Sequence, residues 1–262
     1  MKKVRFYSYF FILMYYRVEG DMNQTNKKIA VLLTAYNEEK NLPSILKEIS
    51  GDYSIYVIDD GSSDQTRVVS LAHGCRVVSH PINLGQGMTA VTGYKVIIKD
   101  GFDIIVKMDA DGQHDPREIP LLIRKIEESD CDIVVGSRRL GSNYASAPFF
   151  RKTFLPVYTW IINRLTGYHM TDAMSGFRCF KAKTLKNIEK ILDDMIEPQY
   201  LASEMFVRFA KAGLTVTEVP INMRERKSGS SYKGFVRYGW GALWAIIQTL
   251  LDKEFMSISN KK

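Results

Sequence analysis

The chain has 262 residues, 45% of them hydrophobic, which is enough for one substantial core with short appendages. Thirty-six Lys and Arg against 29 Asp and Glu give a net charge of +7, which favours phosphate ligands or an anionic membrane surface. The cysteines Cys75, Cys131 and Cys179 include no Cys-x-x-Cys pair, so we expect reduced thiols in a cytosolic setting, without disulfides or zinc.

Strand, polar loop and helix alternate through the first half of the chain. The predicted strands are 28–34, 55–58, 75–79 and 104–108, and the predicted helices are 42–49, 66–72 and 88–99. Asp64 is the expected N-cap of the second helix. This alternation predicts a mostly parallel sheet with right-handed crossovers, in which the polar loops gather at the carboxyl ends of the strands. We therefore expect loops 36–39, 59–64 and 109–113 to share one crevice.

The fourth predicted strand ends in a polar turn, Asp109-Ala110-Asp111-Gly112-Gln113-His114. Asp109 and Asp111 can present carboxylate oxygens to a divalent cation that also holds phosphate oxygens, and Gln113 can add a neutral oxygen. Gly112 allows a positive φ. An isolated Asp-x-Asp is more often turn or helix-cap chemistry, so both interpretations stand for this turn taken alone. The sequence has no Gly-x-Gly-x-x-Gly after the first strand and no phosphate loop of the Gly-Lys-Ser/Thr type, which argues against dinucleotide and ATP-loop binding.

The second half of the chain supplies cations and a further carboxylate. A predicted strand at 132–138 delivers Arg138 to the same edge of the sheet. Glu204 precedes an amphipathic helix at 206–212, where its alternative role is that of a first-turn acid that interacts with the helix dipole. After a strand at 214–219, the basic loop 224–231 could clamp a phosphate, although its charge alone would equally suit a solvated turn.

Two segments suit a membrane surface. Residues 149–162 mix aromatic, aliphatic and cationic side chains at helical spacing, and residues 238–251 place Trp240 and Trp244 on one helical face. Neither reaches the roughly 18 uninterrupted apolar residues of a spanning helix. The alternative for both is closure of the core or of a subunit interface. Residues 1–27 form a basic and aromatic extension, with Met22 as an alternative start.

Five motifs occur in a fixed order along the chain. They are Val31 to Glu39, Asp59-Asp60-Gly61-Ser62-Ser63-Asp64, Asn83-Leu84-Gly85-Gln86-Gly87, Asp109 to His114, and Gly136-Ser137-Arg138. Together they resemble the family 2 inverting glycosyltransferases, nearest to the dolichol-phosphate mannosyltransferases and polyprenyl-phosphate glycosyltransferases. The resemblance implies a GT-A fold, a Rossmann-like three-layer α/β fold with a mostly parallel central sheet, over residues 28–232. Residues 233–262 would then form an amphipathic membrane-associating helix and tail.

The resemblance also implies a site. The donor is a nucleotide-diphosphate sugar of the GDP-mannose or UDP-glucose type, with Mg²⁺ or Mn²⁺ as cofactor. The implied donor-binding residues are Tyr36, Glu38, Asp60, Asp109, Asp111 and Gln113, of which the last three match the metal site. The implied acceptor-phosphate residues are Arg138, Arg151, Arg226 and Lys227, and the implied catalytic residues are Asp111, Arg138 and Glu204. Tyr36 and Glu38 could equally be ordinary loop residues, and the serine that the family carries four residues after Arg151 is Leu155 here.

The expected reaction is metal-dependent transfer of a sugar, with inversion, to a polyprenyl phosphate. An ionised phosphate needs no general base, so cations would align it. One alternative is transfer to a sugar hydroxyl, with Glu204 or Asp172 as the base; Asp172 lies in Thr171 to Arg178, which resembles the family's acceptor-side motif. Another is a non-catalytic nucleotide-sugar-binding module. We expect a protein attached peripherally to the cytoplasmic face of a membrane, directly or through a membrane-embedded partner protein, and no nucleic-acid partner.

Overall fold

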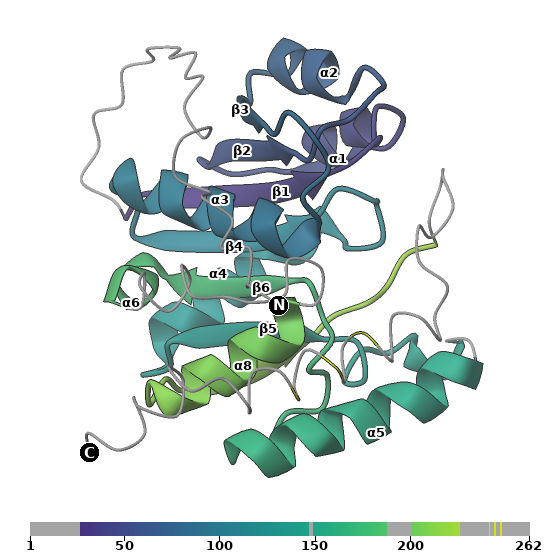
Figure 1. The fold of residues 1–262 in the computed structure, drawn as a ribbon, viewed down its shortest axis with the longest axis vertical. Coiled ribbons are helices and arrows are strands. Elements are labelled where there is room, and N and C mark those ends of the chain that lie inside the picture. Colours follow the sequence, from purple (N-terminus) through teal and green to yellow (C-terminus); the bar gives the residue numbers. More distant parts are fainter. Residues whose placement is uncertain are drawn as a thin grey trace, which may run out of the picture.

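The structure, a computed structural model, describes residues 27–146, 149–187 and 201–225, together with 241, 244 and 247. Within them, seven strands form one sheet in the order β3-β2-β1-β4-β6-β5-β7 (Figure 1). The strands are β1 (Ile29–Ala35), β2 (Ser54–Asp59), β3 (Arg76–Ser79), β4 (Ile104–Asp109), β5 (Ile133–Ser137), β6 (Arg178–Lys181) and β7 (Val216–Pro220). All neighbours run parallel except β6, which is antiparallel to both β4 and β5.

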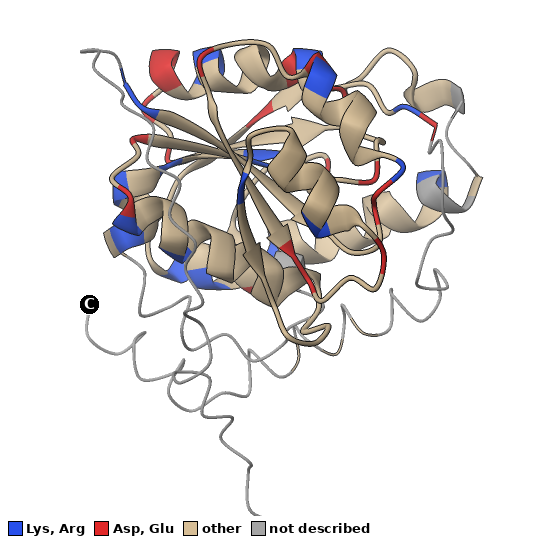
Figure 2. Ribbon diagram, turned by 90° about the horizontal axis from the view of Figure 1, so that it is seen from above, with Lys and Arg blue, Asp and Glu red and all other residues tan. Residues whose placement is uncertain are grey.

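Helices cover both faces of this sheet. They are α1 (Leu42–Glu48), α2 (Thr66–Ala72), α3 (Gln86–Lys99), η1 (Pro116–Glu118), α4 (Ile119–Glu128), η2 (Tyr144–Ser146), α5 (Phe149–Thr166), α6 (Ala182–Asn187) and α8 (Leu201–Lys211). Seen from above, helices lie on either side of the fanned strands, and acidic and basic residues are distributed around the outside (Figure 2). The expected three-layer α/β fold with a mostly parallel sheet is therefore confirmed.

Strand alternation divides the core into two clusters. Along β1, Ala30 and Leu32 face α3, α5, α6 and α8, whereas Val31 and Leu33 face α1 and α4. Successive side chains of a strand point to opposite faces, so a strand covered on both sides reads as a continuous apolar run. Each fully buried Leu contributes about 1.5–3 kcal/mol relative to an exposed one. The sheet is thus a rigid support for the loops that leave its edge.

The predicted elements agree closely with those observed. The helix predicted at 88–99 begins two residues earlier, because Gly85, with φ of 95°, accepts hydrogen bonds from both the backbone and the hydroxyl of Thr89. Asp64 acts at the start of α2 as expected, since its carboxylate accepts from the backbone N–H of Thr66 at 2.9 Å, although the position next to the helix is Gln65. All three cysteines are free, as predicted, and the structure shows that they are buried.

The carboxyl ends of β1, β2 and β4 lie side by side. Ala35 pairs with Asp59 across β1 and β2, and Thr34 pairs with Asp109 across β1 and β4. The loops predicted to meet therefore leave the same edge of the sheet, as expected for parallel strands. In the part of the chain that the structure describes, no helix combines the length and apolar character needed to cross a membrane.

Candidate active site

The turn after β4 has the local geometry that its sequence predicts. Gly112 has φ of 77°, and its missing side chain leaves open space. The Asp111 carboxylate accepts a hydrogen bond from the backbone N–H of Gln113 at 3.0 Å. The capping role falls instead to Asp115, whose side chain accepts from the backbone N–H of Arg117 at the start of η1. Asp109 and Asp111 thus remain available for the metal site that the turn predicts.

Asp109 lies in a dense set of donors at the end of β4. Its Oδ1 accepts hydrogen bonds from Lys107 Nζ at 2.5 Å, Gln86 Nε2 at 2.7 Å and Thr34 Oγ1 at 3.1 Å. Burial acts to raise the pKa of Asp109, but the charge of Lys107, the charge of His114 and the hydrogen bonds from Lys107 and Gln86 together hold that pKa well below its usual range. A side chain at Gly176 would come within 2.5 Å of Asp109 Oδ2, so only glycine allows this close approach.

The residues of the turn fit a divalent cation. Within the described residues, no group of three or more His, Cys, Asp or Glu could hold a metal alone. Two carboxylates and the Gln113 amide leave several positions of a Mg²⁺ or Mn²⁺ ion for oxygens of a bound diphosphate. Such a partial set of hard oxygen ligands suits a metal that arrives with a nucleotide.

His114 is a packing residue on the side of this turn. Its ring is 3% exposed, lies 5.2 Å from the ring of Phe177, and its Nδ1 faces the backbone N–H of Asp109 at 3.4 Å. Burial lowers the pKa of His114 although Asp109 and Asp111 act to raise it. His114 therefore packs between the backbone of the turn and Phe177.

The predicted donor residue Asp60, on the second loop, is held by contacts with the segment that precedes α3. Asp60 is 3% exposed, and its carboxylate accepts from the backbone N–H groups of Leu84 and Gly85 at 2.9 and 2.8 Å. Its Oδ1 also lies 2.8 Å from His80 Nδ1. Asp60 thus shapes the loop before α3, and its predicted nucleoside contact stays a prediction.

Tyr36 and Glu38 differ in exposure. Tyr36 is half-buried at the end of β1, whereas Glu38 is buried and accepts a hydrogen bond from the Asn41 amide. The backbone N–H of Glu38 donates to the Thr66 hydroxyl at 2.8 Å, which ties the first loop to the second. Asn37 between them adopts φ of 56° and accepts from the backbone N–H of Ser63. Hydrogen bonds therefore hold the first and second loops together.

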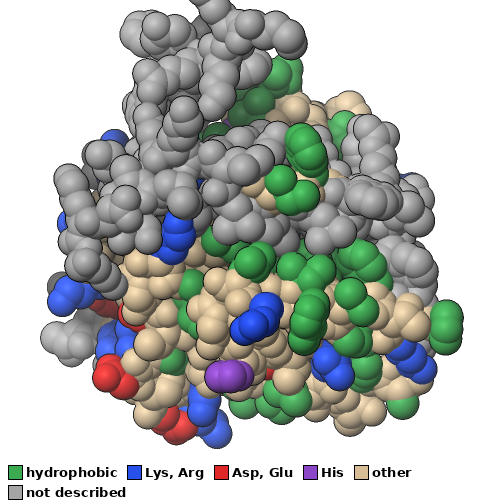
Figure 3. All heavy atoms as spheres, turned by 60° about the horizontal axis from the view of Figure 1, so that its bottom comes forward, with side chains coloured by type: hydrophobic (Ala, Val, Ile, Leu, Met, Phe, Trp, Pro, Cys, Tyr) green, Lys and Arg blue, Asp and Glu red, His purple; other side chains and the backbone are tan. Residues whose placement is uncertain are grey.

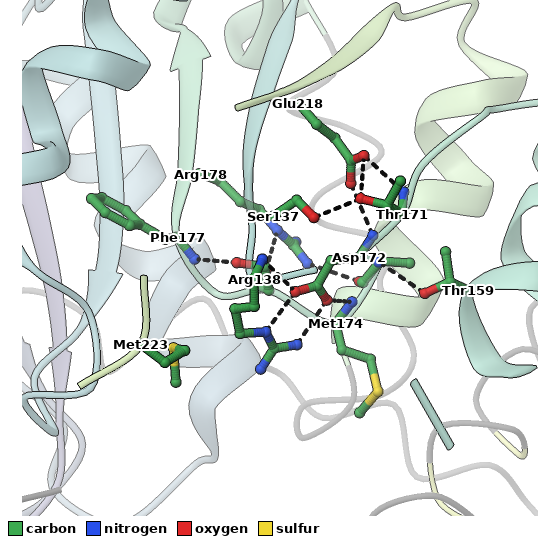
Figure 4. Close-up of polar contacts among 12 residues, drawn as sticks. Ser137, Arg138, Thr159, Thr171, Asp172, Met174, Phe177, Arg178, Glu218 and Met223 are labelled. Atoms are coloured by element: carbon green, nitrogen blue, oxygen red, sulfur yellow. Dashed lines mark hydrogen bonds and ion pairs between the residues drawn. The ribbon is translucent and has the colours of Figure 1, made fainter. Parts of the chain in front are cut away.

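The side chain of Arg138, the residue directly after β5, is held in one orientation by Asp172 (Figure 4). Its Nε and Nη2 donate to the two carboxylate oxygens of Asp172 at 2.5 and 2.7 Å, and its backbone N–H donates to the same group at 3.1 Å. The Asp172 side chain is fully buried. Burial acts to raise the pKa of Asp172, but Arg138 outweighs it and lowers that pKa. Two parallel hydrogen bonds fix the plane of the guanidinium.

Glu204 lies inside the protein, in the first turn of α8. It is fully buried, and its Oε1 lies 2.7 Å from Nε of Arg208 one helical turn later, which is also buried. The neighbours Met205 and Phe206 belong to the core cluster beneath α3 and α5. This placement is that of an internal ion pair on one helix.

The other predicted phosphate residues are described only in part. Arg151 lies in α5, but its side chain is outside the described residues, as are Arg226 and Lys227. Leu155, at the position of the family serine, is 1% exposed and packs in the interior. Arg224 Nη1 pairs with Glu48 at 2.6 Å, and Arg224 Nη2 with Asp115 at 2.5 Å.

Three residues that contact or closely approach Asp109 were not among the predicted site residues. Lys107 looked like one residue of a buried strand, and only its charge within an otherwise apolar run signalled a partner. Gln86 and Gly176 lie in motifs that carry the family resemblance, but nothing in the sequence predicted their contacts with Asp109, because these contacts join segments far apart in sequence. All three lie on the α3 side of the sheet edge, around the first aspartate of the turn.

Comparisons with known proteins agree with this geometry. The family model described as glycosyl transferase family 2 matches residues 30–189. The chain is 29% identical to the undecaprenyl-phosphate mannosyltransferase of Micrococcus luteus, over 78% of this chain and 86% of that protein. It is 31% identical to the UDP-N-acetylglucosamine–dolichyl-phosphate N-acetylglucosaminyltransferase of Methanococcus voltae, over 75% of this chain and 85% of that protein.

A solved structure shows the same fold. A crystal structure of glucosyl-3-phosphoglycerate synthase from Mycobacterium tuberculosis, in complex with Mn²⁺, UDP and glucosyl-3-phosphoglycerate, matches with a TM-score of 0.64 and 21% identity, covering 86% of this chain and 79% of that one. The family model, the relatives and the arrangement of the three loops agree. The chain belongs to glycosyl transferase family 2 and is a glycosyltransferase with a GT-A fold.

Proposed function

We propose that this glycosyltransferase transfers a sugar, with inversion and with a divalent metal, from a nucleotide-diphosphate sugar to a polyprenyl phosphate. One observation carries the choice of acceptor. Arg138 is held at the carboxyl end of β5, whereas the two candidate general bases, Asp172 and Glu204, are fully buried and paired with arginines. The edge thus presents a fixed cation, which an anionic acceptor needs, and neither candidate base is placed to deprotonate a hydroxyl.

The named activities of the relatives support this acceptor. Both the Micrococcus luteus and the Methanococcus voltae enzymes carry a polyprenyl phosphate in their names, although the sugars differ. The common element is therefore the lipid phosphate. For this chain the donor class is a nucleotide-diphosphate sugar of the GDP-mannose or UDP-glucose type.

On the donor side, Asp109, Asp111 and Gln113 would hold Mg²⁺ or Mn²⁺. The ion supplies charge stabilisation to the nucleoside diphosphate as it leaves. Asp109 is kept ionised by Lys107 and is held in place by Gln86 and Thr34, so its carboxylate is already oriented before the donor binds. Tyr36, Glu38 and Asp60 belong to the fastened loops next to this turn, where the nucleoside would lie.

On the acceptor side, Arg138 would orient the attacking phosphate oxygen toward the anomeric carbon, on the face opposite the diphosphate. The bidentate contact with Asp172 fixes the orientation of the guanidinium. Charge-assisted hydrogen bonds from an arginine also offset the repulsion between two anions. Arg151, Arg226 and Lys227 are the further cations proposed for this phosphate, and no geometry of their side chains enters the argument.

We propose that the enzyme meets its lipid acceptor as a peripheral protein on the cytoplasmic face of a membrane, alone or with a membrane-embedded partner protein. The helix α5 supports this, because its two faces differ. Leu155, Tyr158 and Ile162 are buried, whereas Val157 and Trp160 are 57% and 66% exposed. Figure 3 shows hydrophobic side chains gathered on this side of the molecule, with basic side chains beside them. Such a surface suits the headgroup region of an anionic bilayer.

The test is sugar transfer from a panel of labelled nucleotide sugars to polyprenyl phosphate, with Mn²⁺ or Mg²⁺ and with chelator. We expect label from one donor in the organic phase, in a product that mild acid releases and that requires metal. Metal-dependent donor hydrolysis without a lipid product would contradict the proposed acceptor and would point to a hydroxyl instead.

A further inference from the structure

We propose that Glu218, on the edge strand β7, fixes the orientation of Arg138 by holding Asp172 in place. Glu218 is then a positioning residue, because its hydrogen bonds go to the backbone of Thr171 and Asp172 and to the Thr171 hydroxyl. The inference rests on the proposed function, since transfer to a phosphate acceptor is what requires Arg138 to be oriented.

Glu218 accepts hydrogen bonds from two consecutive backbone amides (Figure 4). Its Oε1 lies 2.9 Å from the backbone N–H nitrogen of Asp172, and its Oε2 lies 2.7 Å from that of Thr171. The Thr171 hydroxyl also donates to Oε2 at 2.8 Å. The carboxylate thus fastens the segment that carries Asp172 to the edge of the sheet.

The same segment determines how Arg138 lies. The Asp172 carboxylate accepts hydrogen bonds from Nε, Nη2 and the backbone N–H of Arg138, so a displacement of Asp172 would turn the guanidinium. The Thr171 hydroxyl lies 2.6 Å from the hydroxyl of Ser137, the residue before Arg138. Glu218 itself sits opposite Val135 in the pairing of β5 with β7. Glu218 on β7, the Asp172 segment and Arg138 are therefore joined by a continuous set of hydrogen bonds.

Other contacts hold the far end of the segment. The backbone N–H of Ala173 donates to the Thr159 hydroxyl at 3.2 Å, and Arg178 Nε donates to the Ser175 carbonyl at 2.8 Å. Those contacts restrain residues beyond Asp172. The amides of Thr171 and Asp172 are held by Glu218, and a carboxylate suits this task because both of its oxygens accept.

The substitution Glu218→Gln tests whether Glu218 holds both backbone amides. Glutamine has nearly the same size but only one acceptor oxygen, so one of the two amides would face an NH₂ group. A buried or half-buried amide without an acceptor costs more than a weakened hydrogen bond, so the segment should shift. Glu128→Gln, an exposed carboxylate at the end of α4, is the matched control.

The first readout is independent of activity. In an NMR spectrum of ¹⁵N-arginine-labelled enzyme, the Nε–H signal of Arg138 is identified by its loss in Arg138→Lys. We expect slow exchange of this proton with water in the wild type and roughly tenfold faster exchange in Glu218→Gln. Glu128→Gln should leave it unchanged. An equal exchange rate in Glu218→Gln and wild type would overturn the inference.

The second readout is kinetic. Glu218→Gln should raise KM for polyprenyl phosphate about tenfold and leave KM for the donor near the wild-type value. In an Arg138→Lys background the same substitution should have little further effect, because the two residues act together. An equal factor in both backgrounds would show a separate structural role and would overturn the inference.

Failure of the proposed function is visible separately. If the wild type makes no lipid-linked product, the acceptor proposal is wrong, whereas the exchange rate of the Arg138 proton still decides the role of Glu218. If Glu218→Gln loses nucleotide binding through misfolding, Thr171→Val removes one of the three contacts with Glu218. It should then accelerate the same exchange about threefold, and an unchanged rate would overturn the inference.

Discussion

Lys107 Nζ lies 2.5 Å from Asp109 Oδ1, and both side chains project from the same face of β4. The Lys107 side chain is 7% exposed and that of Asp109 is 22% exposed. This ion pair holds the carboxylate of the first aspartate of the proposed metal turn in place. It also makes the turn dependent on a residue inside the sheet.

Replacement of Lys107 with Met should destabilise the fold. Removing one partner of a buried ion pair typically costs about 3–5 kcal/mol, and we expect a loss toward the lower end, because Asp109 is 22% exposed and keeps its hydrogen bonds from Gln86 and Thr34. Urea unfolding should show this loss, whereas Lys183→Met, at an exposed position in α6, should change the unfolding free energy by no more than about 0.5 kcal/mol. A Lys107→Met protein as stable as the wild type would show that the ion pair does not contribute to the free energy of unfolding.

Replacement of Asp111 with Ala should abolish metal-dependent turnover in a folded protein. Asp111 is half-buried on the turn, and its one described contact is with the backbone N–H of Gln113. Its loss should therefore leave the fold intact while weakening Mn²⁺ binding at least about tenfold, by analogy with the loss of other metal-site contacts. The free Mn²⁺ signal in electron paramagnetic resonance measures this, with Asp130→Ala, on an exposed turn, as control. A fully active Asp111→Ala enzyme would rule out the assignment.

Replacement of Glu204 with Gln should affect stability more than chemistry. Arg208 would remain buried without the opposing charge of Glu204, so we expect a loss of up to about 3–5 kcal/mol in unfolding free energy. A general base would instead contribute about 10²–10⁴-fold to the rate. Turnover per folded enzyme at low temperature distinguishes the two, and a hundredfold slower reaction in a stable Glu204→Gln protein would restore the role of Glu204 as a base.

Asp115 should make the fold sensitive to acid. Burial acts to raise the pKa of Asp115, but hydrogen bonds from Arg117 and Arg224 outweigh it and lower the pKa from 3.8 to about 2. A lowered pKa in the folded state contributes stability that is present above the unfolded value and is lost as the pH falls through the folded value. The melting temperature of wild type should exceed that of Asp115→Asn by a constant amount above pH 5, and the gap should narrow between about pH 4 and pH 2. A gap independent of pH would contradict this.

The sequence predicted the strands and the edge where their loops meet, because short runs of β-branched and aliphatic residues, such as 29–33, end in polar turns and alternate with helical patterns. The position of β6 could not be predicted. Its antiparallel place between β4 and β5 depends on pairing between segments that local periodicity does not connect.

Candidate site residues could be predicted from the sequence only where a charged side chain directly follows an apolar strand. Asp109, Asp111 and Arg138 stood out because charged residues follow apolar strands. Glu218 did not, since an acid in an edge strand usually reads as solvent-exposed. Its contacts with Thr171 and Asp172 arise from the folded chain alone.

The most direct test of the account compares two acceptors that differ only in their terminal phosphate group. Polyprenyl phosphate and the corresponding polyprenol are offered to the same enzyme, donor and metal, and transfer is measured for wild type and Arg138→Lys. We predict transfer to the phosphate alone, with a loss of at least about tenfold in kcat/KM for Arg138→Lys, whose single ammonium cannot replace the bidentate guanidinium. Transfer to polyprenol at a comparable rate, or a phosphate reaction that is unaffected in Arg138→Lys, would contradict the claim that a fixed arginine selects an ionised acceptor.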